Sequence, residues 1–296
     1  MTAAPVILFA FNRPDLLRSC LKALCDNQEA ERTPLYIYVD GARNDKEAEK
    51  VAEVLEVART AKGFASVKVV SSGTNKGLGA SIIAGVSEVM NLHGRAIVIE
   101  DDLVVTGNFL AYMNQFLDKY EDEKQVFSIC GYSLDVNPPE SYTADTYFCH
   151  RSSSWGWGSW KDRWESVDWN PSEESIIRYG KAFNRWGGSD CKGMLLGWKK
   201  RKNTSWAIRF CFSQFIQDKP SLFPVRSLVN PDAGFSGDGT NCRKYSRFRH
   251  LLSDGLKREF SYPDSLEVNP AILQNTLKYH SVGKRIWSRL MYLINR

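Results

Sequence analysis

Three consecutive carboxylates, Glu100, Asp101 and Asp102, directly follow four apolar residues. Carboxylates this close to a buried strand are unfavourable unless a cation or hydrogen-bond donors compensate them. A divalent ion bound to a diphosphate would do so, because hard oxygen ligands suit Mg²⁺ and Mn²⁺ and the ion would act as a Lewis acid. An isolated acidic triplet would favour an exposed acidic turn instead. The interpretation as a metal site therefore depends on which other residues lie beside the triplet.

Three other short loops carry residues suited to binding a ligand: Asn12-Arg13, Asp40-Gly41 and the glycine-containing loop 75–79. Each follows a predicted strand. Apolar runs predict strands over 6–11, 35–39, 67–70 and 96–99, and helical spacing predicts helices from Pro14, over 45–62 and through 82–89. This alternation indicates an α/β fold with a mostly parallel sheet covered on both faces, whose ligands bind beyond the carboxyl ends of the strands. The four loops should therefore meet at one rim, which favours a metal site over an acidic turn.

The character of the chain changes after about residue 107. A helix is predicted over 109–120 and a strand over 126–130, and aromatic, glycine and basic residues then become frequent. Most of the nine tryptophans lie between Trp155 and Trp206. Such a cluster can stack on the apolar faces of sugar rings or pack between two lobes.

The C-terminal stretch 284–296 predicts an amphipathic helix with Ile286, Leu290, Leu293 and Ile294 on one face and basic residues beside them. Such a helix suits peripheral association with an anionic membrane, or it docks on the protein body. The residues leave both interpretations open.

The totals exclude several classes of protein. A net charge of +5 over 296 residues is mild, so nucleic acid is not an expected partner. The seven cysteines form no Cys-x-x-Cys pair, which argues against a zinc knuckle or a disulfide framework. No secretory signal and no run of about 20 apolar residues is found. The sequence predicts a cytoplasmic protein with reduced thiols.

The stretch 5–14, the strand end 39–41, the loop 75–79 and the triplet 100–102 occur in the order typical of one family. Together they make the chain resemble a glycosyltransferase of the GT-A fold, a Rossmann-like fold that binds nucleotide-sugars. It is similar to bacterial family 2-like enzymes and to N-acetylglucosaminyltransferase I, which carries the same Glu-Asp-Asp form of the Asp-x-Asp motif. The resemblance covers about the first 110 residues and extends, more weakly, to 154–160, 206–209 and 234–241.

This resemblance implies roles for the residues of the nucleotide side. The backbone near Phe11 and the side chain of Arg13 would contact the nucleoside. Asp40 would accept a hydrogen bond from the base, as suits the imide of uracil. Asn75 and Gly77 would line the nucleotide pocket.

The resemblance also implies roles for the triplet and a division of the chain. Glu100 and Asp101 would belong to the donor site, with Asp101 at the ribose or the donor sugar, and Asp102 would bind Mn²⁺ or Mg²⁺ directly. The donor would be a nucleotide-sugar and the acceptor a glycan or a lipid-linked glycan. The predicted parts are a nucleotide-sugar-binding half (1–106), an acceptor-binding and catalytic half (107–270) and a basic amphipathic C-terminal helix (271–296).

Two positions depart from the pattern of the family. Related enzymes often carry an Asp, the catalytic base, directly after the Trp that aligns with Trp206, where this chain has Ala207. Many also end the glycine-rich segment with a His near the metal, where this chain has Asn241. Inversion at an anomeric carbon needs a group that takes the proton of the acceptor hydroxyl, and Asp190 is the first candidate. The further candidates are Asp168 and Asp238, and a solvated loop carboxylate is the alternative for each of the three.

Other side chains of the second half are candidates for binding. Arg209 is a candidate partner for the diphosphate, because guanidinium forks match phosphate oxygens, with a structural salt bridge as the alternative. Trp155, Trp157 and Trp206 are candidates for stacking on the acceptor, with core packing as the alternative.

The sequence thus predicts a metal-dependent, inverting glycosyltransferase that takes a UDP-sugar, in bacterial surface polysaccharide synthesis. A sugar-phosphate nucleotidyltransferase would need a glycine-rich loop after the first strand, where this chain has Asn12-Arg13-Pro14-Asp15. A dehydrogenase would need Gly-x-Gly-x-x-Gly at the same place. A non-catalytic carbohydrate-binding protein of the same fold remains an alternative because of Ala207 and Asn241.

Overall fold

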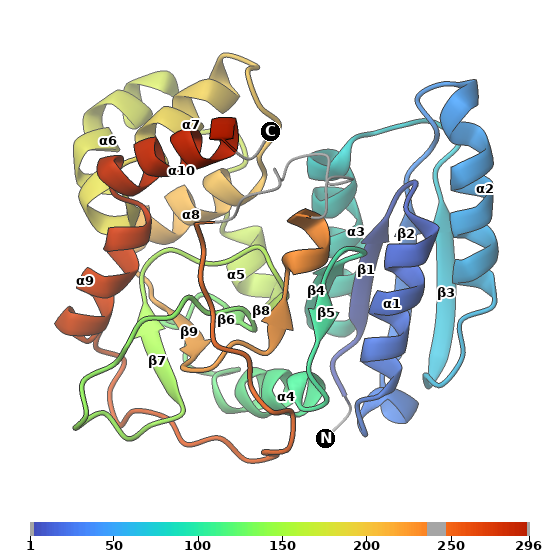
Figure 1. The fold of residues 1–296 in the computed structure, drawn as a ribbon, viewed down its shortest axis with the longest axis horizontal. Coiled ribbons are helices and arrows are strands. Elements are labelled where there is room, and N and C mark those ends of the chain that lie inside the picture. Colours follow the sequence, from blue (N-terminus) through green and yellow to red (C-terminus); the bar gives the residue numbers. More distant parts are fainter. Residues whose placement is uncertain (1–2, 236–246, 295–296) are drawn as a thin grey trace.

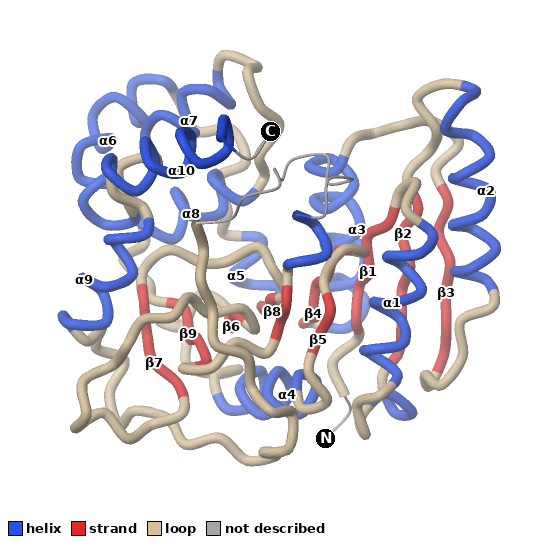
Figure 2. Tube along the Cα trace, viewed as in Figure 1, coloured by secondary structure: helices blue, strands red, loops and turns tan. Residues whose placement is uncertain are grey.

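The computed structural model describes residues 3–235 and 247–294. An eight-stranded sheet runs through the molecule in the strand order β3-β2-β1-β4-β8-β6-β9-β7 (Figure 1). Figure 2 shows these strands as a band with helices in front of it and behind it.

The N-terminal half of the sheet is parallel throughout. β1 pairs with β2 and β4, and β2 pairs with β3, all in parallel register. The elements of this half are β1 (Val6–Ala10), α1 (Pro14–Cys25), the 3₁₀ turn η1 (Ala30–Arg32), β2 (Pro34–Val39), α2 (Asp45–Arg59), β3 (Ser66–Ser71), α3 (Leu78–His93) and β4 (Arg95–Glu100). Each strand lies within one residue of its predicted bounds, so the α/β class is confirmed.

The side chains of β1 alternate between two faces and divide the core accordingly. Val6 and Leu8 belong to the core packed by α1, α2 and α4. Ile7 and Phe9 belong to a second core with residues of α3. Because neighbouring residues of a strand point to opposite faces, a continuous apolar run is what a strand buried on both faces requires.

Beyond β4 the sheet is mixed. β8 pairs antiparallel with β4 and β6, β6 pairs parallel with β9, and β9 pairs antiparallel with β7. The strands are β6 (Ile129–Cys130), β7 (Thr146–Cys149), β8 (Trp157–Trp160) and β9 (Ser221–Pro224), and a separate ladder joins β5 (Val104–Val105) to β10 (Val229–Asn230). Of the strand predicted over 126–130, β6 alone forms. The sheet continues across the predicted boundary at residue 106, and the division into halves stays an interpretation.

The helices of the second half form two groups. α4 (Phe109–Lys119) packs on the sheet at β8, and α5 (Lys161–Glu165) packs against α3. α6 (Glu173–Gly187), α7 (Cys191–Lys199) and α8 (Ala207–Ile216) share an apolar core of their own and lie together beside the sheet (Figure 1). The 3₁₀ turn η2 (Asp232–Phe235) ends the first described range.

The helix predicted over 284–296 corresponds to α10 (Val282–Ile294), and the predicted C-terminal part 271–296 also contains a second helix, α9 (Pro270–Tyr279). The chain is held at the break between them, because the carbonyl of His280 accepts hydrogen bonds from both N–H and Oγ of Ser189 (3.3 and 2.6 Å). The side chain of His280 is also buried. These contacts end α9 and let α10 start in a new direction.

Candidate active site

The acidic triplet ends β4 and lies beside the end of β1. Asp101 N donates to the carbonyl of Phe9 (3.0 Å), and Phe11 N donates to Oδ2 of Asp101 (3.4 Å). The guanidinium of Arg13 spans two carboxylates: Nη1 lies 2.9 Å from Oδ2 of Asp102, and Nη2 bonds Oδ1 of Asp101. The loops after the first and fourth strands therefore meet, as their places in a parallel sheet predict.

The triplet carries more negative charge than Arg13 neutralises. Burial raises the pKa of Glu100 to about 8, and the charges of Asp102 and Asp101 add to the shift. Burial also raises the pKa of Asp101 to about 6, although Arg13 opposes this. A divalent cation would relieve this excess, and carboxylate oxygens are ligands that Mg²⁺ and Mn²⁺ prefer.

Asp102 is the best-placed ligand for such a cation. Its side chain is 17% exposed, whereas that of Asp101 is 2% exposed. Within residues 3–235 and 247–294, no three His, Cys, Asp or Glu side chains gather as a metal site. A cation at Asp102 would therefore need further ligands from a diphosphate and water, as Mg²⁺ commonly does. Metal binding at Asp102 stays a prediction.

Asp40 fixes the loop that follows β3. Its Oδ1 accepts hydrogen bonds from the backbone N–H groups of Gly41 (3.0 Å) and Lys76 (2.8 Å), and its Oδ2 accepts one from Gly77 N (2.8 Å). Nδ2 of Asn75 donates to the carbonyl of Gly41 (2.8 Å). The loops after β2 and β3 are thus tied together at the rim. Contact of Asp40 with a base stays a prediction.

The start of α3 leaves room at this rim. Gly77 precedes the helix with a φ of 77°, a backbone conformation that favours glycine, and no atom of the described residues lies within 4 Å of the place its Cβ would take. Phe11 is half-buried, and the guanidinium carbon of Arg43 lies 5.1 Å from its ring centroid. An open helix N-terminus favours an anion, as a diphosphate would be.

Two close approaches bring the second half of the chain to the rim. A Cβ on Gly234 would lie 2.9 Å from Oδ2 of Asp102, and a Cβ on Gly79 would lie 2.5 Å from the carbonyl oxygen of Thr204. The glycine-rich segment thus begins beside the predicted metal ligand, and the loop before α8 touches α3. Asp238 and Asn241 lie outside the described residues.

A cavity of about 350 Å³ lies between β7, β9 and the helices α7, α8 and α9. Asp190, Ala207 and Trp155 all line it. Trp155 meets Tyr132 edge to face, with ring centroids 4.7 Å apart, and Phe248 at 5.7 Å. Asp190, the predicted base, and Trp155, a predicted acceptor-stacking ring, therefore line the same cavity as Ala207, the position where the resemblance places the base of related enzymes.

Asp190 is held by a two-point ion pair. Nη1 of Arg151 lies 2.8 Å from Oδ1 of Asp190, and Nη2 lies 3.3 Å from Oδ2. Nη1 also lies 3.2 Å from Nδ1 of His280. Burial would raise the pKa of Asp190, but the charge and hydrogen bonds of Arg151 outweigh it and hold the pKa below its usual range. Asp190 is therefore ionised at neutral pH, as a base must be, with reduced proton affinity. Its catalytic role stays a prediction.

Two of the predicted acceptor-binding tryptophans lie in the core instead. Trp157 is 1% exposed, and its ring centroid lies 5.6 Å from that of Trp164 and 5.1 Å from that of Trp206. Trp206 is also buried and packs on Phe210 at 6.0 Å. Neither ring offers a free face to a sugar, so the prediction of acceptor stacking is wrong for this pair. Core packing was the alternative interpretation.

The predicted diphosphate partner Arg209 is a packing residue in the structure. Its guanidinium carbon lies 4.8 Å from the ring of Trp198 and 5.4 Å from that of Trp169, and Nη1 donates to the carbonyl of Trp169 (3.0 Å). Burial lowers the pKa of Arg209. The residue does not line the cavity. Asp168, an alternative base, also lies outside it and accepts a hydrogen bond within its own turn.

Sequence reasoning missed three residues that line the same cavity: Arg151, Arg247 and His280. They lie after β7, before Phe248 and after α9, and no motif joins positions so far apart. The topology, and not the local sequence, brings these residues together.

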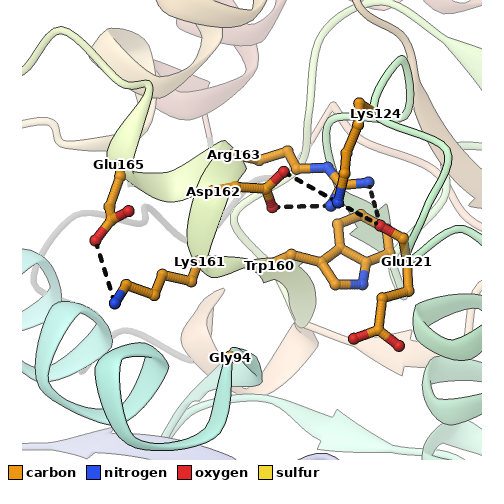
Figure 3. A pocket seen from close by; sticks show the side chains of 8 residues that line it. All are labelled: Gly94, Glu121, Lys124, Trp160, Lys161, Asp162, Arg163 and Glu165. Atoms are coloured by element: carbon orange, nitrogen blue, oxygen red, sulfur yellow. Dashed lines mark hydrogen bonds and ion pairs between the residues drawn. The ribbon is translucent and has the colours of Figure 1, made fainter.

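A second cavity, of about 260 Å³, lies at the opposite end of β4, as Gly94 before β4 and Trp160 at the end of β8 show (Figure 3). Arg163 stacks on Trp160, with its guanidinium carbon 4.2 Å from the ring centroid, and Nη1 pairs with Asp162 (2.8 Å). Lys124 and Glu121 also line it. This end of the sheet is remote from the rim, and its charged groups are engaged in structural pairs.

Several solved structures are similar to the chain at low identity. The Staphylococcus aureus protein TarS, residues 1–349, is 9% identical over 78% of this chain and 62% of that chain, with a TM-score of 0.40. A UDP-glucose pyrophosphorylase complexed with UDP-glucose is 10% identical over 75% of this chain and 90% of that one (TM-score 0.38). The galactosyltransferase LgtC is 14% identical over 60% and 65% (TM-score 0.34). At these scores the similarities indicate no substrate for this chain. A search of curated proteins finds no match.

The sequence profile of glycosyl transferase family 2 matches residues 6–172, more than half of the chain. The matched part contains the parallel half of the sheet, the rim with Asp102 and the strand β8. This agrees with the GT-A fold and the family that the motifs at the strand ends predict. The chain belongs to glycosyl transferase family 2.

Proposed function

We propose that the chain transfers a sugar from a nucleotide-sugar, with UDP as the nucleotide, to a hydroxyl of a glycan or lipid-linked acceptor, and that the reaction depends on Mn²⁺ or Mg²⁺. One observation carries the proposal: the four parallel strands end at one rim of the sheet, where Arg13 meets Asp102, and Gly234 joins this rim to the half of the chain that holds the cavity of Asp190. The family membership supports sugar transfer.

The donor would lie across the rim. The loop tied by Asp40 and the ring of Phe11 border the place for the nucleoside, and the open N-terminus of α3 suits the diphosphate. Asp102 would hold the metal ion, whose contribution when bound is to offset the charge of the leaving diphosphate. Arg13 would have to share Asp102 with that ion or turn toward a phosphate oxygen.

The chemical step would invert the anomeric carbon. Asp190 takes the proton of the acceptor hydroxyl, the oxygen forms a bond to the anomeric carbon, and the bond from that carbon to the diphosphate oxygen breaks. The nucleoside diphosphate leaves with the bonding electron pair. Because Arg151 lowers the proton affinity of Asp190, we expect general-base catalysis near the lower end of its usual range, about 100-fold.

The proposal is tested by nucleotide release. The protein is incubated with UDP-, GDP-, dTDP- and CMP-sugars, with Mn²⁺ or with EDTA, and the free nucleotide is measured. Metal-dependent release from one class names the donor and supports an enzyme. Metal-dependent binding without release, with any of a panel of glycan acceptors, would favour a non-catalytic nucleotide-sugar-binding protein instead. The ion pair of Asp190 with Arg151 supports this second function, because it lowers the proton affinity of the proposed base.

We also propose that the acceptor belongs to bacterial surface polysaccharide synthesis on the cytoplasmic face of the membrane, and that α10 rests on anionic lipid. Val282, Ile286, Trp287 and Leu290 of α10 are 49–58% exposed. No acidic residue occurs after Glu267, and Lys284, Arg285 and Arg289 lie on the same helix. An apolar face with basic neighbours is what an interfacial helix needs.

The six described cysteines are free thiols, which suits the cytoplasm. Among the helices of the described ranges, none combines the length and hydrophobicity needed to cross a bilayer.

Co-sedimentation with vesicles tests the membrane part. Vesicles that contain phosphatidylserine should pellet the wild-type protein, and phosphatidylcholine vesicles should pellet much less of it. Ile286→Glu should abolish this binding. Ile177→Glu, at an equally exposed position on α6, should leave it intact. Equal binding by both variants, or no binding by wild type, would remove the lipid surface from the proposal.

A further inference from the structure

The cavity of Asp190 holds an excess of positive charge. Arg151 and Arg247 line it, and Arg285 stands at its edge, with Nη1 3.2 Å from Oγ of Ser189. Among the described residues that line the cavity, Asp190 is the one carboxylate, and Arg151 already binds both of its oxygens. His280 adds no charge at neutral pH, because burial, and then the neighbouring Arg151, lower its pKa to about 3. Over residues 3–235 and 247–294, Arg247 and Arg285 therefore have no salt bridge of their own, and the carboxylate whose charge reaches Arg247 is Asp190, which Arg151 already binds.

Arg247 is the one of these two groups that lines the cavity. Its Nε donates to the carbonyl of Tyr279 (3.0 Å), which fixes the side chain against the end of α9. Its guanidinium carbon lies 4.3 Å from the ring centroid of Phe248. Over residues 3–235 and 247–294, Nη1 and Nη2 of Arg247 have no hydrogen-bond partner and the residue has no salt bridge. A guanidinium fork held in this way suits the two oxygens of a carboxylate or phosphate.

The rest of the cavity wall suits a sugar. Trp155, Tyr132 and Phe248 supply aromatic faces and edges, and Ser152, Ser153 and Ser154 supply hydroxyl and backbone groups. A volume of about 350 Å³ accommodates one or two sugar rings. A neutral glycan would require the aromatic rings but not a guanidinium without a salt bridge. This wall therefore suits a sugar that carries a negative charge.

We propose that this cavity binds an acceptor sugar that carries an anionic group, a carboxylate or a phosphate, and that Arg247 is the residue that binds this group. The inference rests on the proposed function, since it treats the cavity as the acceptor side of a transferase. Arg247 is attached to α9, whereas the donor diphosphate is expected at Asp102 and α3, so the two anions have separate places.

Saturation-transfer NMR tests the inference with two matched pairs of probes: methyl β-glucuronide against methyl β-glucoside, and glucose 6-phosphate against glucose. UDP and Mg²⁺ are present at saturating concentration to fill the donor site. The charged member of one pair should bind at least about tenfold more tightly than its neutral partner, about 1.4 kcal/mol. Preference within the first pair identifies a carboxylate acceptor, and preference within the second identifies a phosphate.

Variants of one segment locate the binding. Arg247→Gln should abolish the preference for the charged probe, Arg247→Lys should retain part of it, and Arg249→Gln, at an exposed position outside the cavity, should leave it unchanged. Equal binding of charged and neutral probes, binding of the charged probe that is seen only in a parallel sample without UDP, or equal loss in Arg249→Gln would overturn the inference. UDP binding is measured on the same samples. Its loss with the probe preference intact would overturn the proposed donor and leave the anion site standing.

Discussion

Nη1 of Arg13 lies 2.9 Å from Oδ2 of Asp102, while its other terminal nitrogen bonds Asp101, so one guanidinium holds both aspartates of the triplet. Arg13 follows β1, and the aspartates follow β4, which pairs with β1. The contact therefore joins two neighbouring strand ends at the rim. It also places a fixed positive charge where the donor diphosphate and its metal ion are expected.

Removal of this charge should destabilise the fold. Arg13→Gln leaves Asp101, which is 2% exposed, without its cation. We expect the free energy of unfolding to fall by about 2 kcal/mol, less than for a fully buried pair because Arg13 is partly exposed. Urea denaturation measures the change. Arg18→Gln removes exposed pairs with Asp15 and Glu53 and serves as the control, with little expected effect. Equal losses in both variants would contradict a structural role for the Arg13 pair.

Asp190 should matter for turnover more than for donor binding. Asp190→Asn keeps the shape of the side chain and removes its charge, so release of the nucleotide should fall about 100-fold while donor affinity stays within twofold. Asp168→Asn, which lies outside the cavity, should change neither quantity. Steady-state kinetics with the donor identified by nucleotide release measures both. A turnover number near that of wild type would assign the base to another residue.

Arg209 should behave as a packing residue. In Arg209→Ala, the rings of Trp198 and Trp169 lose the guanidinium between them, and the carbonyl of Trp169 loses its donor. We expect a loss of about 2 kcal/mol in unfolding free energy with unchanged donor affinity. Chemical denaturation and titration with UDP provide the two values. A weakened affinity for UDP at unchanged stability would instead support the prediction that Arg209 binds the donor diphosphate.

His280 should make stability depend on pH. Burial, with Arg151 next, lowers its pKa to about 3, whereas a histidine in the unfolded chain titrates near 6.5. Between these values the unfolded chain binds a proton that the folded chain does not, so His280 reduces stability as pH falls below about 6.5. At pH 5 the effect amounts to about 2 kcal/mol.

His280→Asn removes the titration and keeps an acceptor near the place of Nδ1. The variant should therefore lose about 2 kcal/mol less stability than wild type between pH 7.5 and pH 5, as measured by urea denaturation at each pH. His93→Asn, the same substitution at the exposed end of α3, is measured beside it for comparison. If the stability of His280→Asn depended on pH in the same way as that of wild type, His280 would take up its proton in the folded state as well.

The parallel half of the fold was predictable because its signals are local. The apolar runs of β1, β2, β3 and β4 are short, end in polar or glycine residues and alternate with helical spacing, and each strand was placed within one residue. The rim followed from topology alone, since the carboxyl ends of parallel strands meet at one edge. The contact of Arg13 with Asp102 is a consequence of that edge.

The second half was less predictable because long-range packing decides it. Trp155 and Trp157 are two residues apart, yet one lines a cavity and the other is buried in the core. Arg209 was predicted to bind the diphosphate because it is an arginine, but its guanidinium packs on two indole rings that lie 11 and 40 positions away in the sequence. Arg151 and His280 meet across 129 positions, and no pattern in the sequence marks that contact.

Asp102 as the metal ligand of a nucleotide-sugar site is the central claim, and ligand-induced thermal stabilisation tests it most directly. Melting temperatures are measured for wild type and Asp102→Ala with UDP-, GDP-, dTDP- and CMP-sugars, each with and without Mn²⁺. Binding to the folded state raises the melting temperature by mass action. We expect a rise with UDP-sugars that requires Mn²⁺ and is absent in Asp102→Ala. The same rise without Mn²⁺, or in Asp102→Ala, would contradict the metal site, and no rise with any nucleotide would contradict the donor site itself.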